Sequence, residues 1–506
     1  MPSRILEAWN AEPVDASAVP VLPLDDFQQI VADVLTAGAR MTAFFGRPAG
    51  GGKTLVTAAL ADDPNGKLGL LSTLAGASYP SLAAECPAVQ AFERELYEQY
   101  GVRPEGHPWL KPLRFEPPHA EGVDPWGRVA SPSPIPGDYP FFAVEGEEVH
   151  EVAVGPVHAG VIEPGHFRFQ CHGEHVFHLE IALGYQHRGV EKLLLGGPDR
   201  RTIALLESTA GDTAVGHALA HANAVEALAG SQPPARAVVL RGVALELERL
   251  ANHVGDLGML AGDVGFLPTA SYCGALRAEF LNALAEICGN RFGRGLVVPG
   301  GVRFDLDGPA ALRLADKVQK AWGDVEEATK LFFRSPSARN RTDGTGVVSR
   351  EVCNQLGLVG PAARACGVAR DVRRDHATGV FRFVHVPVMT GESGDVFARA
   401  WVRYLESERS ADFVVRQLRA LPRGPVRAAC GPPAKDRLVV SMMEAWRGEL
   451  AHVAATGGDG RFARYKIVDP SFHNWMGLAM ALRGEQISDF PLCNKSFNLS
   501  YCGHDL

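Results

Sequence analysis

Apolar residues recur every three or four positions along most of the second half of the chain. This spacing places them on one face of an α-helix, so it predicts helices rather than strands. The predicted helices cover residues 198–230, 233–262, 268–292, 308–334 and roughly 392–420. Helices of this length, each with an apolar stripe, are typical of a helical bundle. A shorter stretch, His175–Gly184, alternates between apolar and polar residues and predicts a strand. We therefore expect residues 144–506 to form a mainly helical bundle with a small β-sheet at its start.

The first 114 residues carry a different pattern. Amphipathic helices are predicted over residues 24–38 and over Ser81–Gly101, and strands in the segments MTAFFG and TLVTAALA. Residues 1–114 should therefore form a small α/β domain, and the whole chain should belong to the α+β class. Seven prolines fall between residues 115 and 140, so residues 115–143 are predicted to be an extended linker.

The loop between the two predicted strands, Arg47–Lys53, contains three consecutive glycines and then a lysine. It resembles a phosphate-binding loop, but that motif needs a glycine at the position that Arg47 occupies. A glycine-rich hairpin is the alternative interpretation. The segment after the loop suits a strand better than the helix of a nucleotide site, which favours the hairpin.

Composition excludes several classes of function. A net charge of −8 and an isoelectric point near 6.1 argue against a nucleic-acid partner. The nine cysteines are dispersed and form no C-x-x-C pair, so neither a zinc ribbon nor a ferredoxin-type cluster is expected. The chain shows no signal-peptide pattern and no apolar run of about 18 residues, so we expect no direct membrane span. Any membrane association should then come through partner subunits.

Two histidines, His217 and His221, share one face of a predicted helix at a spacing used in zinc sites. The residues between them include no glutamate to act as a base, and no third ligand is evident. The alternative is that both are buried histidines that form hydrogen bonds within the core.

Four long segments together resemble one known family. They are GPVHAGVIEPGHFRF (155–169), LGYQHRGVEKLL (183–194), LELERLANHVGDLG (245–258) and GPAARACGVARDVRRD (360–375). They resemble the large subunit shared by the energy-converting nickel–iron hydrogenases and respiratory complex I, in the branch of the formate hydrogenlyase large subunits. The segment FERELYEQYGVRPEGHPWLK (92–111) resembles the small hydrophilic subunit of complex I, so the chain resembles a fusion of the two.

The resemblance includes the frames that hold the metals in nickel-binding relatives, but not their thiols. In those relatives two C-x-x-C pairs provide four thiolates. The first frame here retains Glu207 and His217 but has Ala210 and Thr213 at the thiol positions. The second frame follows Asp469-Pro470 and has Ser471 and Asn474. The resemblance therefore implies no nickel–iron centre and no covalently bound cofactor.

The resemblance also implies which side chains surround a redox pocket. His158 and His166 match the two histidines of the complex I hairpin, and Asp263 matches the aspartate that partners the histidine of the quinone site. A His–carboxylate pair would serve as a proton relay. The tyrosine that binds quinone in complex I falls at Gly211 here. His158 bonded to backbone in a hairpin is the other interpretation, and both remain open. Arg364 and Asp371 would face the pocket or a neighbouring iron–sulfur subunit, unless they belong to a solvated charged run.

The functional expectation is a large subunit of a membrane-associated, hydrogenase-related oxidoreductase complex. It would take electrons from a small iron–sulfur subunit, adjoin antiporter-like and other membrane subunits, and lie on the cytoplasmic face of the membrane. A quinone is the candidate occupant of its pocket. The alternative is a non-catalytic scaffold that couples a soluble partner to a membrane pump. The last segment, Trp475–Leu506, is too apolar to be a solvated tail, so it should pack against the core.

Overall fold

The computed structural model describes residues 1–2, 4–115, 119, 125–127, 135–159 and 162–506. Its first part is built on a five-stranded sheet with the order β1-β6-β5-β4, in which β3 pairs with β6. The elements of this part are β1 (Leu6–Ala8), β2 (Val14–Asp15), β3 (Val21–Leu22), α1 (Leu24–Thr36), β4 (Arg40–Pro48), β5 (Thr54–Asp62), β6 (Lys67–Ala75), β7 (Ser78–Pro80), α2 (Gln90–Tyr100) and β8 (Arg103–Glu105).

The predicted glycine hairpin joins β4 to β5, which pair antiparallel in the register Pro48↔Thr54. Gly50, Gly51 and Gly52 all have positive φ, a conformation that residues with a Cβ rarely adopt. The turn is followed by strand β5 and not by the helix of a phosphate-binding loop. The predicted helix over 81–101 is wrong in its first half, because α2 begins only at Gln90. Strand β6, which the sequence pattern missed, completes the sheet.

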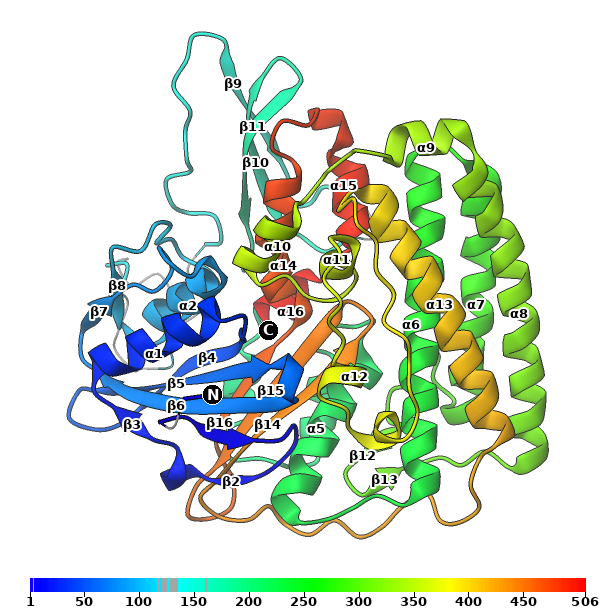
Figure 1. The fold of residues 1–506 in the computed structure, drawn as a ribbon, viewed down its shortest axis with the longest axis horizontal. Coiled ribbons are helices and arrows are strands. Elements are labelled where there is room, and N and C mark those ends of the chain that lie inside the picture. Colours follow the sequence, from blue (N-terminus) through cyan, green and yellow to red (C-terminus); the bar gives the residue numbers. More distant parts are fainter. Residues whose placement is uncertain (3, 116–118, 120–124, 128–134, 160–161) are drawn as a thin grey trace.

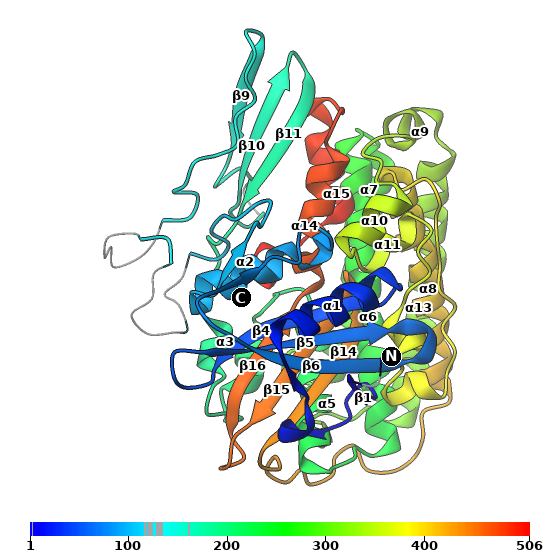
Figure 2. The same ribbon diagram turned by 60° about the vertical axis from the view of Figure 1, so that its left-hand side comes forward.

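A second antiparallel sheet lies near the C-terminus, where helices dominated the prediction. Its order is β16-β15-β14-β2, so a strand from the N-terminal part completes it. The two sheets pack together in one hydrophobic core that includes Phe44 and Leu60 from the first and Met442 and Val453 from the second. Figures 1 and 2 show the first sheet lying across the second. The strands and following helices are β14 (Arg437–Ala445), β15 (Gly448–Thr456), β16 (Phe462–Val468), α14 (Pro470–Ala481), α15 (Phe490–Phe497) and α16 (Tyr501–Asp505).

The helical bundle was predicted closely. Its long helices lie side by side along one edge of the molecule (Figure 1), and α6 packs against both α7 and α13. The predicted helix over 198–230 is interrupted at residues 208–213. The bounds are α3 (Val190–Leu193), α4 (Thr202–Glu207), α5 (Ala214–Ala229), α6 (Ala235–Asp263), α7 (Leu267–Cys288), β12 (Val297–Val298), β13 (Gly301–Val302), α8 (Gly308–Arg334), α9 (Pro336–Thr342), α10 (Arg350–Leu356), α11 (Gly360–Ala365), α12 (Val372–Asp375) and α13 (Val396–Arg419).

A three-stranded sheet projects from the body of the molecule (Figure 2). It consists of β9 (Val149–Val154), β10 (His166–His172) and β11 (His175–Ala182), and β11 is the strand that alternation predicted. Residues 116–118, 120–124 and 128–134 of the predicted linker lie outside the described residues. The described residues of that segment form no helix or strand.

The C-terminal segment packs into the core, as its apolar composition predicted. Phe497, Leu499 and Tyr501 are all buried. The carboxylate of Asp505 accepts hydrogen bonds from the backbone N–H groups of Gly184 and Gln186, each at 2.9 Å. The segment is therefore tied to the loop that follows β11.

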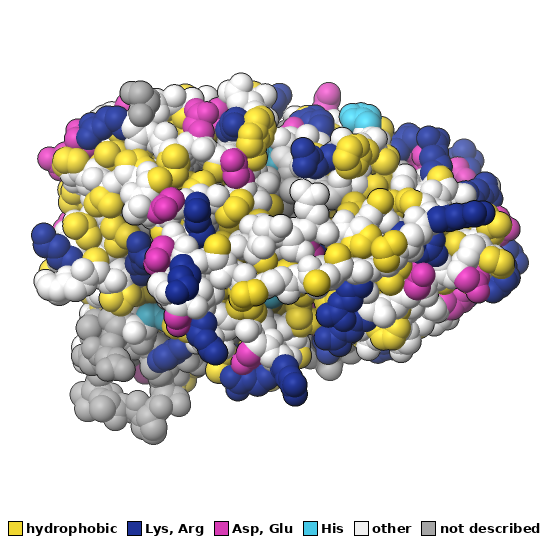
Figure 3. Space-filling view, turned by 90° about the horizontal axis from the view of Figure 1, so that it is seen from below, with side chains coloured by type: hydrophobic (Ala, Val, Ile, Leu, Met, Phe, Trp, Pro, Cys, Tyr) yellow, Lys and Arg dark blue, Asp and Glu magenta, His cyan; other side chains and the backbone are white. Residues whose placement is uncertain are grey.

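The surface carries charges of both signs. One face of the molecule mixes positive, negative and apolar side chains, and Lys and Arg gather toward the helical bundle (Figure 3). Among the described residues, no helix is both long and apolar enough to span a bilayer.

Buried ion pairs connect the first sheet to the second. Arg40 of β4 donates two hydrogen bonds of 2.7 Å to Asp63 and pairs with Glu449 of β15 at 2.5 Å. His376 lies 3.0 Å from Asp63 on the other side. Burial alone would raise the pKa of Asp63, but the charge and hydrogen bonds of Arg40 outweigh burial and hold that pKa well below its usual range.

We predict that Asp63→Ala lowers the free energy of unfolding by about 3 kcal/mol at pH 7, because it leaves Arg40 buried with one partner fewer. The pKa of Asp63 is depressed on folding, so its contribution is complete above about pH 4 and is lost as pH falls. Urea denaturation between pH 3 and pH 7 should show the difference shrinking toward the acid end. Asp25→Ala, on the exposed first turn of α1, serves as the control and should change stability by less than about 1 kcal/mol. A pH-independent difference for Asp63→Ala would contradict the prediction.

Candidate functional site

The first ligand frame lies in the break between α4 and α5. Ala210 and Thr213 are both buried. The Thr213 hydroxyl donates to Asp212 at 3.2 Å and accepts from Trp446 Nε1 at 3.1 Å and from Arg447 Nη1 at 3.2 Å. The Thr213 hydroxyl, which stands at a thiol position of the frame, therefore links this break to the β14–β15 turn through hydrogen bonds.

The second frame lies at the start of α14, where the Asp469 carboxylate accepts a hydrogen bond of 2.8 Å from the Ser471 N–H. The Ser471 hydroxyl accepts from the Ser500 N–H at 2.9 Å. The Asn474 side chain exchanges hydrogen bonds of 3.0 and 3.1 Å with the backbone of Val359. Both side chains have structural partners, and neither lines the cavity beside the first frame.

That cavity has a volume of about 300 Å³ and lies between α6, the α4–α5 break and the C-terminal segment. Gly211, Asp212 and residues 498–502 all line it, whereas Ser471 and Asn474 do not. The lining residues are Ile162, Glu163, Gly211, Asp212, Asn252, Gly255, Asp256, Met259, Arg277, Arg447, Asn494, Lys495, Asn498, Leu499, Ser500, Tyr501 and Cys502.

The charges in the cavity wall are mostly paired. Arg447 donates to both oxygens of Asp212, at 2.6 and 2.7 Å. Burial would raise the pKa of Asp212, but Arg447 keeps that pKa below its usual value. Asp256 accepts from Arg403 at 2.7 Å and from Asn498 at 2.5 Å, yet burial still raises its pKa. The charged side chains of the wall are thus held by hydrogen bonds from neighbouring elements, among apolar side chains such as Met259 and Leu499.

Cys502 is the one cysteine among the described residues that line the cavity. Burial, followed by the negative charge of Glu163, raises the pKa of its thiol to about 12. A thiol with this pKa is neutral at physiological pH, and only the thiolate is a good metal ligand or nucleophile. The donor set therefore does not fit a centre that needs four thiolates.

The predicted relay between His158 and Asp263 is wrong for direct contact, because no hydrogen bond joins these two described side chains. His158 Nε2 lies 3.3 Å from the Tyr501 hydroxyl, and burial lowers the pKa of His158. Asp263, at the end of α6, accepts from Lys495 Nζ at 2.6 Å. Both partners, Tyr501 and Lys495, line the cavity, so the two predicted residues lie behind its wall.

His166 and Glu207 contact neither of these residues. His166 Nε2 accepts from Arg168 Nε at 3.2 Å, and burial lowers the pKa of His166. Glu207 accepts from the Gly295 N–H at 2.6 Å, and burial raises its pKa. Neither side chain lines the cavity, and both hold local structure.

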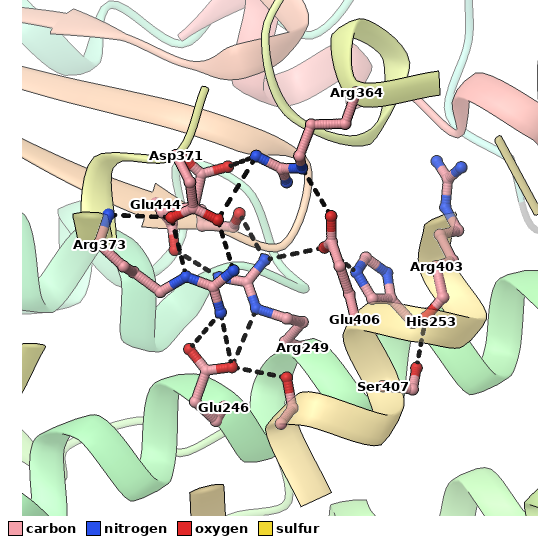
Figure 4. A network of polar contacts seen from close by, with 12 residues as sticks. Glu246, Arg249, His253, Arg364, Asp371, Arg373, Arg403, Glu406, Ser407 and Glu444 are labelled. Atoms are coloured by element: carbon pink, nitrogen blue, oxygen red, sulfur yellow. Dashed lines mark hydrogen bonds and ion pairs between the residues drawn. The ribbon is translucent and has the colours of Figure 1, made fainter. Parts of the chain in front are cut away.

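Arg364 and Asp371 belong to a buried ion-pair network, shown in Figure 4, and not to a solvated charged run. Arg364 pairs with Glu406 of α13 and Glu444 of β14, each at 2.7 Å. Asp371 pairs with Arg373 at 2.6 Å. Neither residue lines the cavity, so the expectation that they face the pocket is wrong. They join the helices to the second sheet.

His217 heads a chain of buried rings that sequence reasoning did not find. His217 Nδ1 lies 3.1 Å from His452 Nε2, and His452 Nδ1 lies 2.9 Å from the Tyr465 hydroxyl. The same hydroxyl lies 2.9 Å from His221 Nδ1. His217 and His221 are therefore connected through His452 and Tyr465 rather than directly. At the other end, His217 Nε2 lies 3.3 Å from Asp469 Oδ2 without an aligned hydrogen bond.

The pKa values of these groups decide which atom donates in each of these hydrogen bonds. Burial lowers the pKa of His221 to about 3 and that of His452 well below its usual value, so both rings are neutral. Burial would raise the pKa of Asp469, but His217 and Arg447 keep that pKa low. A carboxylate favours an N–H facing it, so His217 carries its proton on Nε2. Nδ1 then accepts from His452, which accepts from Tyr465, which accepts from His221.

Only one part of this row of hydrogen-bonded rings had a sequence signal, the spacing of His217 and His221. His452 and Tyr465 lie on β15 and β16, more than 200 residues further along the chain. Residues 498–502 were predicted to be buried, but nothing in their pattern placed them opposite Gly211. Among the described residues, no group of three or more His, Cys, Asp or Glu side chains is arranged to hold a metal ion.

Comparison with known proteins identifies the class to which this fold and site belong. Residues 263–437 and 429–505 match the family described as the respiratory-chain NADH dehydrogenase 49 Kd subunit, and residues 61–127 match the 30 Kd subunit. The two families are thus joined in one chain, in agreement with the resemblance of residues 92–111.

Individual relatives extend the match to hydrogenases. The chain is 34% identical over 352 residues to the carbon monoxide-induced hydrogenase of Rhodospirillum rubrum, covering 69% of this chain and 97% of that protein. It is 30% identical over 435 residues to formate hydrogenlyase subunit 5 of Escherichia coli, covering 84% and 76%. It is 31% identical over 369 residues to NADH-quinone oxidoreductase subunit 4 of Thermus thermophilus, covering 68% and 90%. The chain therefore belongs to the family of large subunits common to these hydrogenases and complex I.

We predict that the Cys502 thiol of the folded protein reacts with iodoacetamide at pH 8 roughly a thousandfold more slowly than an unperturbed cysteine, because a pKa near 12 leaves so little thiolate. Mass spectrometry of the labelled peptide over time measures the rate, and the half-buried Cys430 provides the internal comparison. Labelling of Cys502 as fast as that of a free thiol would show that the cavity holds a thiolate.

Proposed function

We propose that this chain is the large subunit of a membrane-associated, hydrogenase-related oxidoreductase complex that works without a nickel–iron centre. The observation that carries the proposal is the cavity between Asp212 and residues 498–502, whose wall contains one neutral thiol. Family membership supports the complex-bound role, since the relatives include a formate hydrogenlyase subunit and an NADH-quinone oxidoreductase subunit.

The cavity suits a small molecule with carbonyl acceptors, and a quinone head group is the candidate. Arg277 Nε is buried without a hydrogen-bond partner, and Arg277 lines the cavity. A guanidinium N–H of this kind would donate to a carbonyl oxygen. Lys495, whose Nζ gives one hydrogen bond to Asp263, supplies further donors on the same wall. Electrons would come from an iron–sulfur cluster in a small partner subunit, and antiporter-like membrane subunits would hold the assembly at the cytoplasmic face of the membrane.

The buried rings supply the route for protons in this proposal. Asp469 lies near Arg447 at the cavity wall, and the chain leads from it through His217, His452 and Tyr465 to His221. A proton added at the unprotonated Nε2 of His221 would let His221 pass its Nδ1 proton to Tyr465, Tyr465 to His452, His452 to His217 and His217 to Asp469 at the cavity end, with no ring required to hold a lasting charge. In this proposal, these hydrogen-bonded rings replace the relay expected between His158 and Asp263.

A non-catalytic scaffold is the second candidate. The observation that favours it is that Asp212 and Asp256 of the cavity wall are each paired with an arginine, Arg447 and Arg403. Under that alternative the cavity binds no redox partner, and the subunit only couples its neighbours.

We predict that the purified complex contains far less than about one nickel per chain and evolves no hydrogen, because the donor set lacks thiolates. Elemental analysis and a hydrogen-evolution assay measure both quantities on the same preparation. Reduction of a short-chain quinone by the complex, lost in Arg277→Met, would favour the enzyme over the scaffold. Stoichiometric nickel would overturn the proposal.

We predict that Tyr465→Phe slows proton-coupled turnover of the complex by roughly a hundredfold, since it removes the one oxygen that joins His452 to His221. The ring stays in place, so the fold and subunit assembly should be retained. Turnover and its solvent deuterium isotope effect, measured from pH 6 to pH 8, report the loss. Tyr404→Phe, in the aromatic cluster of α13, is the matched control and should leave turnover unchanged. Normal turnover with an unchanged isotope effect in Tyr465→Phe would exclude the rings from His217 to His221 as a proton route.

A further inference from the structure

A second cavity, of about 220 Å³, lies where the region of the 30 Kd type meets the large-subunit region. Its walls come from α2 and the segment 108–113 on one side, and from β11, α14 and His504 on the other. A dry cavity of about 150 Å³ is enough to hold a benzene molecule. This space can therefore take a small organic molecule, and it is separate from the cavity beside Asp212 because the two have no lining residue in common.

The cavity wall contains a buried cation without a counterion. Arg94 is 8% exposed, and it donates to the carbonyl oxygens of Lys111 at 2.9 Å and Pro112 at 2.8 Å. It forms no ion pair with any described residue. Glu98 and Glu180 attract this guanidinium electrostatically without forming an ion pair with it, whereas other buried arginines of the junction pair directly with carboxylates.

Two ring nitrogens at the cavity are also unsatisfied. Trp475 is 5% exposed and lines the cavity, and its indole Nε1 has no hydrogen-bond partner. His178, on β11, has a buried Nε2 without a partner. Buried polar groups of this kind are nearly always hydrogen-bonded in native proteins, so each one needs an explanation. An indole N–H can only donate, which means that the missing partner is an acceptor.

The charges around the cavity favour an anion. Glu180 is its one carboxylate among the lining residues, and Glu180 already pairs with Lys111 at 2.7 Å and accepts from the Phe142 N–H at 2.7 Å. Arg94 lies inside and Arg483 at the exposed rim. The remaining wall is largely apolar and aromatic, with Trp109 and Met476 among its members, and its other polar residues are Gln90, His178 and His504.

We propose that this junction cavity binds a small amphipathic anion, a carboxylate attached to an aromatic or short aliphatic body. The carboxylate would accept from Arg94 and from Trp475 Nε1, and the body would pack against the apolar wall. A ligand in this position contacts both regions of the chain at once, so binding stabilises their junction. The site is independent of the function proposed for the cavity beside Asp212.

Isothermal titration of the full chain, alone or in its complex, with phenylacetate and with hexanoate tests the proposal. We expect saturable binding of at least one of them at millimolar concentration or below. The neutral amides phenylacetamide and hexanamide should bind at least about tenfold more weakly, because a hydrogen bond to a charged group contributes more than one between neutral groups.

Two variants locate the site. Arg94→Gln should weaken carboxylate binding by at least about tenfold, and Trp475→Phe, which keeps an aromatic wall but removes the N–H, by about three- to tenfold. Arg483→Gln is the matched control, since it removes the same charge from the exposed rim, and it should change affinity by less than about threefold. If Arg94→Gln fails to fold, Trp475→Phe and the comparison of acid with amide still decide the question.

Three results would overturn the proposal. They are no saturable binding of either carboxylate, equal affinity for the acids and their amides, or affinities in Arg94→Gln and Trp475→Phe that match those of Arg483→Gln. Turnover of the complex plays no part in these measurements, so failure here is distinguishable from failure of the proposed oxidoreductase role.

Discussion

The arrangement of this molecule depends on the pairing of charges that folding removes from water. At the centre of Figure 4, Arg249 of α6 lies between Glu246 and Glu406, and Arg364 lies between Glu406 and Glu444. These residues come from α6, α11, α13 and β14. Loss of one partner in such a network destabilises a protein by about 3–5 kcal/mol, since the remaining charge stays buried. The network therefore fixes the helical bundle against the second sheet.

This fixed junction sets the geometry of the cavity beside it. Trp446 and Arg447 follow β14 directly, and they hold Asp212 and Thr213 through hydrogen bonds. Residues 498–502 form another part of the wall, and the neighbouring Asp505 binds the loop at Gly184. The resulting cavity holds donors for an acceptor but no set of thiolates for a metal centre.

The hydrogen-bonded rings and the junction cavity differ in their electrostatic surroundings. The rings from His217 to His221 are joined end to end by hydrogen bonds, and burial keeps His452 and His221 neutral, which suits proton transfer without charge storage. The junction cavity around Arg94 has the opposite character, since an unbalanced cation there attracts an anion. Both features lie against the second sheet or the helix that follows it.

The sequence by itself determined the family, the α+β class and the long helices, because apolar periodicity over 308–334 or 396–419 leaves one packing face. It also showed that Ala210 and Thr213 are not thiols and that the last 30 or so residues belong to the core. Only the tertiary structure decided the partners of His158, Asp263, Arg364 and His217. A side chain's neighbours depend on how distant segments pack, and His217 and His452 are brought together by sheet and helix packing that no local pattern encodes. The second sheet was missed for a similar reason: β14 and β15 are buried on both faces, so the alternation that reveals a half-exposed strand is absent.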